Sequence, residues 1–245
     1  MPPLQHLSDE GFTEQYCTLR GKEGRLYTDA ALKNLPVVSP QHPHYGEWIM
    51  RKQSADRLLR YALKRNAPLN ILEVGCGNGW LSARLAAANA NWQVTGMDIN
   101  TIELQQAQRV FAGQGNLQFL YGNLDSSGTK ERHYDLIIFA ASIQYFPSLK
   151  ATLKLALEHT SLYGEVHIMD SPLYQPDEVT AAGKRTKEYY TGLGFPGMVQ
   201  RYFHHSILEL EPFRYRVLHN PRMLLQRFRR HRSPFYHIAV KNHYL

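Results

Sequence analysis

The stretch ILEVGCGNGWLSARLA, residues 71–86, decides the fold of this chain. Its first four residues predict a buried strand, and the helical spacing that follows predicts a helix over residues 80–88. Between them, Gly75, Gly77 and Gly79 stand at alternate positions. Glycine adopts positive φ without strain and lets a ligand approach the backbone, while a helix N-terminus presents amides that lack intrahelical partners. We therefore predict a strand–turn–helix unit that binds a small polar ligand at its turn.

Strands and helices alternate on both sides of this unit. A helix with apolar residues on one face starts at Glu47 and is stopped by Pro68. Further along, Asn100 is placed to cap a helix with Glu103 as its reciprocal partner, and Ser148 is placed to cap another. Further strands are predicted at residues 92–97, 117–121, 134–141, 164–170, 213–220 and 234–242.

The order of these elements predicts the sheet. Strands joined by helical crossovers pair in parallel, and the unbroken apolar run at 134–141 is typical of a central strand covered on both faces. The last two strands lie close enough in sequence to pair antiparallel. We expect an α/β fold: a doubly wound, mostly parallel seven-stranded sheet with an antiparallel edge strand, in three layers α/β/α.

Two segments depart from this alternation. Residues 1–45 are rich in turn formers, with several prolines and glycines, and predict a loosely structured N-terminal arm. Residues 46–245 then form the α/β domain, with an insertion at about residues 171–212. Because this insertion is rich in aromatic and titratable side chains, we expect it to cover the active face like a lid.

The charge and composition are those of a soluble globular protein. The formal net charge of +7 could favour polyanionic partners, and the densest basic stretch is RFRRHR at residues 227–232. A solvated arginine-rich face is the simpler interpretation, so nucleic acid is a lesser alternative to a small-molecule substrate.

Cysteines and apolar stretches limit the protein class further. Cys17 and Cys76 are too few for a disulfide framework or a structural zinc site, and no metal is expected. The sequence shows neither a signal peptide nor a stretch long enough to cross a bilayer. We expect a cytoplasmic protein without membrane association, and the sequence leaves its oligomeric state open.

An acid at the end of the next strand narrows the choice of ligand. Asp98 stands 19 residues after Gly79, where a carboxylate can accept hydrogen bonds from both hydroxyls of a ribose. A nicotinamide site shares this acid, but its G-x-G-x-x-G turn has its third glycine where Trp80 stands, and an indole would crowd a pyrophosphate. Glu73, directly before the glycines, adds a negative charge that opposes phosphates and suits a ligand bearing an ammonium and a sulfonium.

Residues 73–79, Glu-Val-Gly-Cys-Gly-Asn-Gly, match the E/D-x-G-x-G-x-G pattern of the first motif of class I S-adenosylmethionine-dependent methyltransferases. The chain resembles this family over about residues 45–170, through Asp98, the strand at 117–121 and the segment YDLIIFAASIQYF. The resemblance implies a Rossmann-like fold, S-adenosylmethionine as cofactor and transfer of a methyl group.

The resemblance also implies which residues hold the cofactor. The turn glycines would line its methionine moiety, Asp98 would bind the ribose, and the position after the third strand would read the adenine. Where many relatives have an aspartate this chain has Asn123, whose side-chain oxygen can still accept a hydrogen bond, and Asp125 is the competing candidate. Trp48 and Arg51 lie on a helix that often closes over the cofactor carboxylate in similar enzymes, with a surface position as the alternative. The cofactor-binding residues assigned in this way are Glu73, Gly75, Cys76, Gly77, Asn78, Gly79, Asp98, Ile99, Asn123, Leu124, Ala141 and Arg51.

Methyl transfer from a sulfonium needs alignment more than a base, so catalytic residues are harder to predict. His204, His205 and Tyr190, all in the insertion, are the candidates for contacting the acceptor and moving a proton. Packing or solvent exposure is the alternative for each. We expect a methyltransferase that acts on a small-molecule acceptor by in-line displacement. An RNA or protein methyltransferase and a non-catalytic cofactor-binding regulator are the alternatives.

Overall fold

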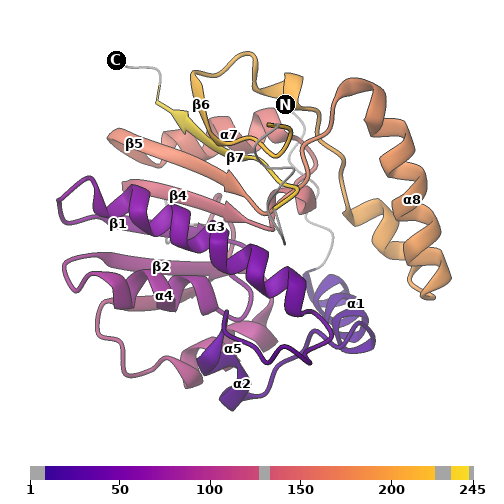
Figure 1. Cartoon of the computed structure of the whole chain (residues 1–245), viewed down its shortest axis with the longest axis horizontal. Helices are drawn as coiled ribbons and strands as arrows, with labels where there is room; N and C mark the ends of the chain where they lie inside the picture. Colours follow the sequence, from indigo (N-terminus) through magenta and orange to yellow (C-terminus); the bar gives the residue numbers. More distant parts are fainter. Residues whose placement is uncertain (1–8, 127–132, 224–232, 243–245) are drawn as a thin grey trace.

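The computed structural model describes residues 9–126, 133–223 and 233–242, so the basic stretch at 227–232 lies outside the described residues. A seven-stranded sheet runs through the described part in the order β3-β2-β1-β4-β5-β7-β6 (Figure 1). Its strands are β1 (Asn70–Val74), β2 (Gln93–Asp98), β3 (Leu117–Tyr121), β4 (Tyr134–Ala140), β5 (Thr160–Met169), β6 (Tyr215–His219) and β7 (His237–Lys241).

The pairing of these strands confirms the predicted sheet. β1 pairs in parallel with β2 and β4, β2 with β3, and β4 with β5. β7 runs antiparallel to both β5 and β6. The antiparallel strand therefore lies one position inside the edge, and β6 is the outermost strand on that side.

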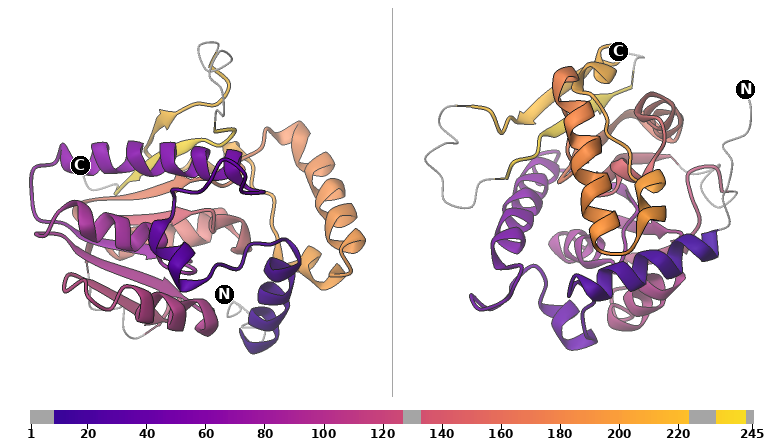
Figure 2. Two further views of the ribbon diagram at one scale, coloured as in Figure 1. Left: turned by 60° about the horizontal axis from the view of Figure 1, so that its bottom comes forward. Right: turned by 90° about the vertical axis from the view of Figure 1, so that its right-hand side faces the viewer.

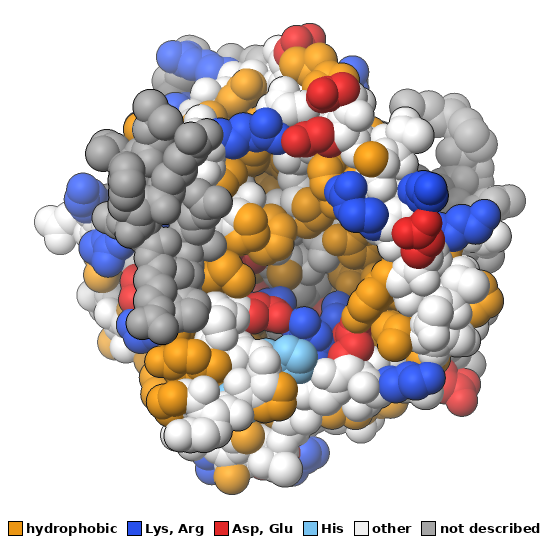
Figure 3. Space-filling view, turned by 45° about the vertical axis from the view of Figure 1, so that its right-hand side comes forward, with side chains coloured by type: hydrophobic (Ala, Val, Ile, Leu, Met, Phe, Trp, Pro, Cys, Tyr) orange, Lys and Arg blue, Asp and Glu red, His pale blue; other side chains and the backbone are white. Residues whose placement is uncertain are grey.

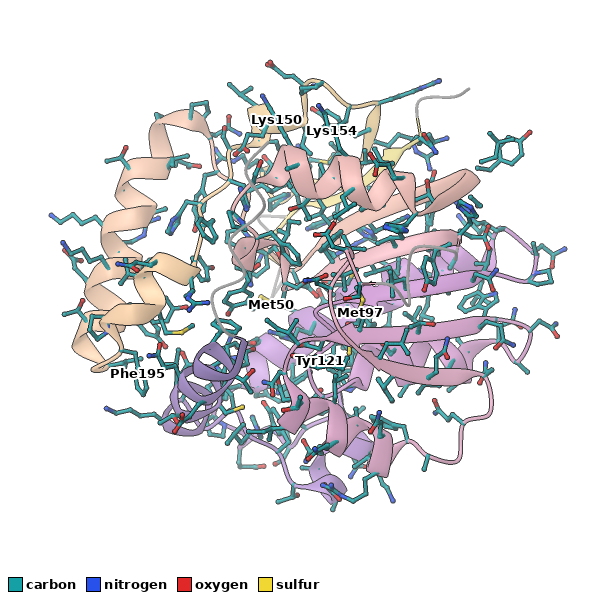
Figure 4. All side chains as sticks on the ribbon, turned by 180° about the vertical axis from the view of Figure 1, so that it is seen from behind. Met50, Met97, Tyr121, Lys150, Lys154 and Phe195 are labelled. Carbon is teal, nitrogen blue, oxygen red and sulfur yellow. The ribbon has the colours of Figure 1, made fainter. Side chains whose placement is uncertain are left out.

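Helices cover both faces of the sheet. α3 (Tyr45–Leu63), α4 (Trp80–Ala88) and α5 (Thr101–Val110) lie on one face, and α7 (Leu149–Glu158) lies on the other. Figure 4, seen from behind, shows α7 with Lys150 and Lys154 in front of the sheet. Side chains alternate between the two cores along β4, where Leu136 and Ile138 join one cluster and Ile137 and Phe139 the other. This two-sided burial explains why β4 is apolar without alternation.

Several element ends lie where the sequence predicts them. α4 begins at Trp80 and ends at Ala88. The Asn100 side chain accepts hydrogen bonds from the backbone amides at the start of α5, and Ser148 caps α7 in the same way. Glu103 bonds to the Asn100 side-chain amide rather than to its backbone, so the reciprocal cap forms through the side chain.

The N-terminal arm is more regular than the predicted loose segment. It contains α1 (Asp9–Lys22) and α2 (Asp29–Asn34). α1 packs against α8 (Val179–Gly192), which lies within residues 171–212, and Figure 2 shows the two helices beside the sheet end that holds the site. Their shared apolar cluster is built around Leu19, Tyr190 and Met198. We call α1 and α8 the cover.

Short 3-10 turns complete the described part at Ile143–Tyr145, Pro176–Glu178, Pro196–Arg201 and Ile207–Leu210. Among the helices that the structure describes, none combines the length and the apolar composition needed to span a bilayer.

Candidate active site

Two adjoining cavities lie beneath the cover, at the carboxyl ends of β1, β4 and β5. The inner cavity, about 100 Å³, is lined by the glycine turn together with arm residues and α3. The outer cavity, about 510 Å³, extends from α3 towards α8. Arg20, Arg25, Glu47, Arg51 and Ala141 line both spaces, so the cavities meet at these residues. Figure 3 shows the hollow on this face, with acidic and basic side chains among hydrophobic ones.

The glycine turn is held in place by β2. The backbone amides of Gly75 and Cys76 both donate to the Met97 carbonyl, at 2.8 and 3.1 Å. The Gly77 amide donates to the Asp98 carboxylate at 2.7 Å. The amides of these three turn residues are therefore satisfied within the protein, so the turn offers a ligand its shape more than free donors.

Glycine is required at this turn for two reasons. All three glycines have positive φ, between 52 and 74°. A Cβ at Gly75 would lie 2.6 Å from the Cβ of Ser142, and one at Gly79 would lie 2.5 Å from the Phe119 ring. At Gly77 the nearest atom would be a Glu103 oxygen at 3.4 Å, so this middle glycine is the most open of the three.

Glu73 lies buried beneath the turn, 2% exposed, and lines the inner cavity. Burial raises its pKa to about 8, although a hydrogen bond from Ser82 opposes the shift. The carboxyl is therefore mostly protonated at neutral pH. The expected negative charge is therefore largely absent from Glu73 at neutral pH in the unliganded protein.

Glu103, expected only as a capping residue, is a second acid at the inner cavity. It lines the cavity, and its carboxylate accepts a hydrogen bond from the Asn100 side chain at 2.9 Å. Burial, followed by the nearby charge of Asp98, raises the pKa of Glu103 to about 7. Its position one turn into α5, with the Asn100 cap, was the available signal, but capping explained the residue without a ligand.

Asp98 ends β2 beside these acids. One carboxylate oxygen accepts from the Gly77 amide and the other from the Asn100 amide at 2.8 Å. Burial raises the pKa of Asp98, although these backbone hydrogen bonds oppose the shift. Each oxygen has a second lone pair, so the carboxylate retains capacity for a ribose.

Basic side chains line the opposite wall. Arg51 donates to Glu47 at 2.9 Å, and Arg25 pairs with the same carboxylate at 2.7 Å. Burial would raise the pKa of Glu47, but the hydrogen bond from Arg25 and the charge of Arg51 lower it to about 2. Arg51 also lies over the Trp48 ring, with its guanidinium carbon 5.4 Å from the ring centroid. Trp48 and Arg51, the two residues of α3 that the sequence predicted at the cofactor, both line the inner cavity.

The arm supplies a part of the site that the sequence did not predict. Tyr16, Arg20, Arg25 and Tyr27 all line the inner cavity. Arg20 donates to the Tyr145 hydroxyl at 2.9 Å, which links the arm to the segment after β4. The Arg20–Tyr145 contact joins residues 125 positions apart, so no local pattern could have revealed it.

The remaining predicted cofactor residues occupy different places. Cys76, Asn78 and Ala141 line the inner cavity, and burial raises the pKa of the Cys76 thiol, as expected for a small buried residue. Ile99 lies under α1, where its carbonyl accepts from the Thr13 hydroxyl at 3.5 Å. Gly79, Asp98, Ile99, Asn123 and Leu124 are not among the residues that line either cavity in the described part of the chain.

The segment after β3 closes on itself. The Asn123 side-chain oxygen accepts from the Asp125 amide at 3.0 Å and from the Ser126 hydroxyl at 3.2 Å. Leu124 is buried in the α7 core, and Asp125 is exposed. Asn123 therefore has less capacity to accept from an adenine than its position suggests.

Of the three predicted catalytic side chains, Tyr190 and His204 both pack against the Tyr202 ring, with centroids 6.0 and 5.3 Å from it. Tyr190 lines the outer cavity, and burial raises the pKa of its phenol, so the hydroxyl stays protonated. His204 is hydrogen-bonded at 2.8 Å to Thr186, which lines that cavity. His205 is buried, with its Nε2 3.2 Å from the Ile143 carbonyl. Burial lowers the pKa of both histidines, and neither of them is among the described residues that line the inner or the outer cavity.

In the described part of the chain, the outer cavity is lined by six aromatic and seven charged side chains, and one of its lining residues has an unsatisfied buried acceptor. Gln144 is 6% exposed, and its Nε2 donates to the Ala141 carbonyl at 2.7 Å. Its Oε1 has no hydrogen-bond partner among the described residues. A buried acceptor without a partner is costly, and this oxygen is enclosed by protein rather than open to the cavity. The aromatic lining residues are Tyr145, Tyr174, Tyr189, Tyr190, Tyr202 and Phe235.

Comparison with known proteins agrees with this geometry. A methyltransferase-domain family matches residues 71–162. Malonyl-[acyl-carrier protein] O-methyltransferase from Priestia megaterium is 32% identical over 89 residues, which cover 36% of this chain and 32% of that protein. Release factor glutamine methyltransferase from Enterococcus faecalis is 28% identical over 130 residues, 49% of this chain and 46% of that protein. The match thus spans less than half the length of these curated relatives.

Solved structures match over nearly the whole chain. Magnesium protoporphyrin IX methyltransferase from Synechocystis PCC 6803, with bound S-adenosylhomocysteine, has a TM-score of 0.59 at 18% identity and covers 95% of this chain and 99% of its own. At this identity the likeness concerns the fold. Joined to the family match over residues 71–162, which contains the glycine motif at 73–79, it shows that the chain contains a region similar to a methyltransferase-domain family within the Rossmann-like fold of S-adenosylmethionine-dependent methyltransferases.

Proposed function

We propose that this chain transfers a methyl group from S-adenosylmethionine to a small-molecule acceptor. The observation that carries the proposal is the pair of adjoining cavities, one beside the glycine turn and one lined by aromatic side chains beneath the cover. A concave, mostly apolar space with a few polar groups is typical of small-molecule sites. The names of the two curated relatives point to different acceptors, a carrier-bound malonyl group and a protein. Because these names give no single acceptor, the choice of a small-molecule acceptor rests on the outer cavity.

The side chains of the inner cavity suit the charges of the methyl donor. Glu73 and Glu103 can ionise against its sulfonium and ammonium, and Arg51 can pair with its carboxylate. The turn residues Gly75, Cys76, Gly77, Asn78 and Gly79 would surround the methionine moiety, with Ala141 facing them. Asp98 would hold the ribose beside Ile99, and Asn123, Leu124 or Asp125 would contact the adenine.

Methyl transfer depends mainly on how the acceptor and the methyl donor are aligned. The donor supplies an activated methyl group, and the acceptor must approach it in line with the breaking carbon–sulfur bond. Holding two reactants in such an arrangement is worth about 7 to 11 kcal/mol, more than a single general base contributes. The cover borders both cavities and would limit the access of water to their junction around bound ligands, and Tyr190 can orient an acceptor by donating a hydrogen bond. His204 stands behind Thr186, and His205 remains a weaker candidate for moving a proton.

Calorimetry and a turnover assay test the proposal. The protein should bind S-adenosylmethionine and S-adenosylhomocysteine and should not bind NAD. Release of S-adenosylhomocysteine should then depend on a small acceptor and should change little between 50 and 200 mM salt. A steep loss with salt would instead favour a nucleic acid substrate. Tight donor binding without turnover on any acceptor would favour a cofactor-binding regulator.

A further inference from the structure

Asp170 occupies an unusual position beside the junction of the two cavities. It follows β5 directly, is 9% exposed and lines the outer cavity. Its φ is +52°, and of the described residues other than glycine only Asn66, Ala141 and Asp170 have positive φ. Two of these three therefore lie at the ends of the neighbouring strands β4 and β5. Such backbone conformations persist where the surrounding structure imposes them, and they cluster at functional sites.

The backbone places Asp170 next to the reacting region. The Ala141 amide donates to the carbonyl of Met169, the residue before Asp170, at 2.9 Å. Ala141 lines both cavities, as does Arg51. Asp170 therefore adjoins the place where an acceptor in the outer cavity meets a methyl donor in the inner one.

The groups that face Asp170 come chiefly from α3. Burial raises its pKa to about 6, while the charges of Arg51 and Arg57 and a hydrogen bond from Ser54 oppose the shift, and Glu47 adds to it. The carboxyl is thus largely ionised at neutral pH, yet weakly enough stabilised to take a proton. The other charged or titratable residues around the outer cavity are Arg20, Glu23 and Arg25 of the arm, Tyr145, Tyr174, Arg185, Tyr189, Tyr190 and Tyr202.

The other groups in this cavity are poorly suited to accept a proton. Glu23 is paired with Arg20 at 2.7 Å, and Glu47 is paired with Arg25 and Arg51. Burial raises the pKa of the Tyr190 phenol, and the same cause raises that of the Tyr202 phenol. These phenols remain protonated at neutral pH and can only donate. Among the described residues that line the outer cavity, Asp170 is the carboxylate without a close arginine partner within 4.0 Å.

The aromatic walls indicate what the acceptor is. Six aromatic side chains surround the outer cavity, and flat rings pack against each other in edge or offset arrangements. Tyr145 and Tyr202 already pack edge to face, with centroids 5.8 Å apart.

We propose that Asp170 is the general base that deprotonates the hydroxyl of an aromatic acceptor during methyl transfer; this rests on the proposed function. The Asp170 carboxylate takes the hydroxyl proton, and an oxygen electron pair forms the bond to the methyl carbon. The carbon–sulfur bond breaks, and its electron pair stays on sulfur, which becomes the neutral thioether of S-adenosylhomocysteine. Asp170 later releases its proton to solvent, so charge and atoms balance.

Substituted phenols of graded acidity, assayed with S-adenosylmethionine, test this role. Asp170→Asn keeps the size of the side chain and removes the base. Its turnover should fall about 10²- to 10⁴-fold on weakly acidic phenols and much less on 4-nitrophenol, which is already ionised near neutral pH. S-adenosylhomocysteine affinity, measured by calorimetry, should stay unchanged. Asp177→Asn, at an exposed acid of the same segment, is the matched control and should behave like the parent.

A pH profile supplies a second readout. The parent rate should fall as the pH drops through about 6, the region where Asp170 takes up its proton. Ser54→Ala removes a hydrogen bond that lowers the pKa of Asp170, so this fall should move to higher pH while the plateau rate is retained. This variant keeps Asp170 itself and tests the role if Asp170→Asn fails to fold.

The outcomes separate this inference from the proposed function. Equal losses by Asp170→Asn on all phenols, reduced S-adenosylhomocysteine affinity, or a Ser54→Ala profile that does not move would overturn the base role. Turnover on thiols or carboxylates but on no phenol would overturn it too, while methyl transfer would stand. Donor binding without turnover on any acceptor would refute the proposed function, and the base role with it.

Discussion

Glu73 and Glu103 lie on either side of the glycine turn, and burial raises their pKa values to about 8 and about 7. A cationic ligand favours the ionised form of each acid and so lowers both pKa values in the complex. Binding of the methyl donor should therefore release protons wherever an acid is protonated beforehand. The product thioether lacks the sulfonium charge and should release fewer.

This linkage predicts how donor affinity depends on pH. Affinity for S-adenosylmethionine should rise as the pH increases from 6 to about 8, by up to about tenfold per pH unit for each acid that ionises on binding. Glu73→Gln, which can still accept from Ser82, should flatten this rise. Calorimetry in two buffers of different ionisation enthalpy measures the protons released. A pH-independent affinity would contradict the expected ionisation.

Asp98 is the second residue whose change has a defined outcome. Asp98→Ala should weaken S-adenosylmethionine binding by about 1 to 3 kcal/mol, because it leaves ribose hydroxyls and the Gly77 amide without their acceptor. Calorimetry with S-adenosylhomocysteine checks this, and Asp98→Asn, which keeps one acceptor oxygen, should lose less. Unchanged affinity in both variants would remove Asp98 from the site.

Helices and strands that are formed by contacts between residues close in sequence were predicted better than those that depend on contacts between distant residues. The sequence predicted α4, β3 and the caps of α5 and α7 well, because local hydrogen bonds and periodic burial on the sheet form them. It missed α1, whose buried Leu19 packs with Tyr190 of α8 and with Met198, far along the chain. The contribution of Arg20 and Arg25 to the site also depends on contacts outside their own segment, so the sequence did not reveal it. The glycine motif, in contrast, consists of consecutive residues, so the sequence alone reveals that part of the site.

Leu19→Ala tests the packing of the cover. Leu19 is 1% exposed and packs between Tyr190 and Met198, and buried leucine-to-alanine changes commonly cost about 2 to 5 kcal/mol. Because α1 lies at the end of the sheet and does not cover either of the sheet's faces, we expect the loss of Leu19 packing to detach this helix locally. Hydrogen exchange should show lost protection in α1 with β1 and β4 unchanged. Leu26→Ala, at a residue 53% exposed, is the control; equal loss throughout the sheet would contradict local detachment.

At the scale of the whole molecule, one buried acid connects helix α3 to strands β5, β6 and β7 at one edge of the sheet. Glu165 on β5 is 3% exposed and accepts from the Tyr61 hydroxyl of α3 at 2.6 Å. It also pairs with Arg65 at 2.7 Å, and Lys241 of β7 and Arg216 of β6 lie at 3.7 and 3.9 Å. Four separate elements therefore meet at this carboxylate.

The pH dependence of stability follows from that arrangement. Burial would raise the pKa of Glu165, but hydrogen bonds from His167 and Tyr61 lower it to about 2. A depressed pKa contributes stability above the unfolded value near 4.5 that is lost as the pH falls towards 2. Glu165→Gln should therefore lower Tm at pH 7, and the gap from the parent should close between pH 4.5 and 2. Glu158→Gln, at an exposed acid on α7, should leave Tm unchanged throughout.

The sharing of arginines between the cavities has a kinetic consequence. Arg20 and Arg25 of the arm border both spaces, and α1 is tied to the α8 region through the Lys22–Leu193 bond at 2.8 Å and the Glu23–Tyr189 contact. One displacement of this pair opens a route from each space to bulk water, so the spent donor and the methylated product would depart in the same event. When such an opening is slower than the chemistry, turnover reports the motion and should slow in viscous solvent.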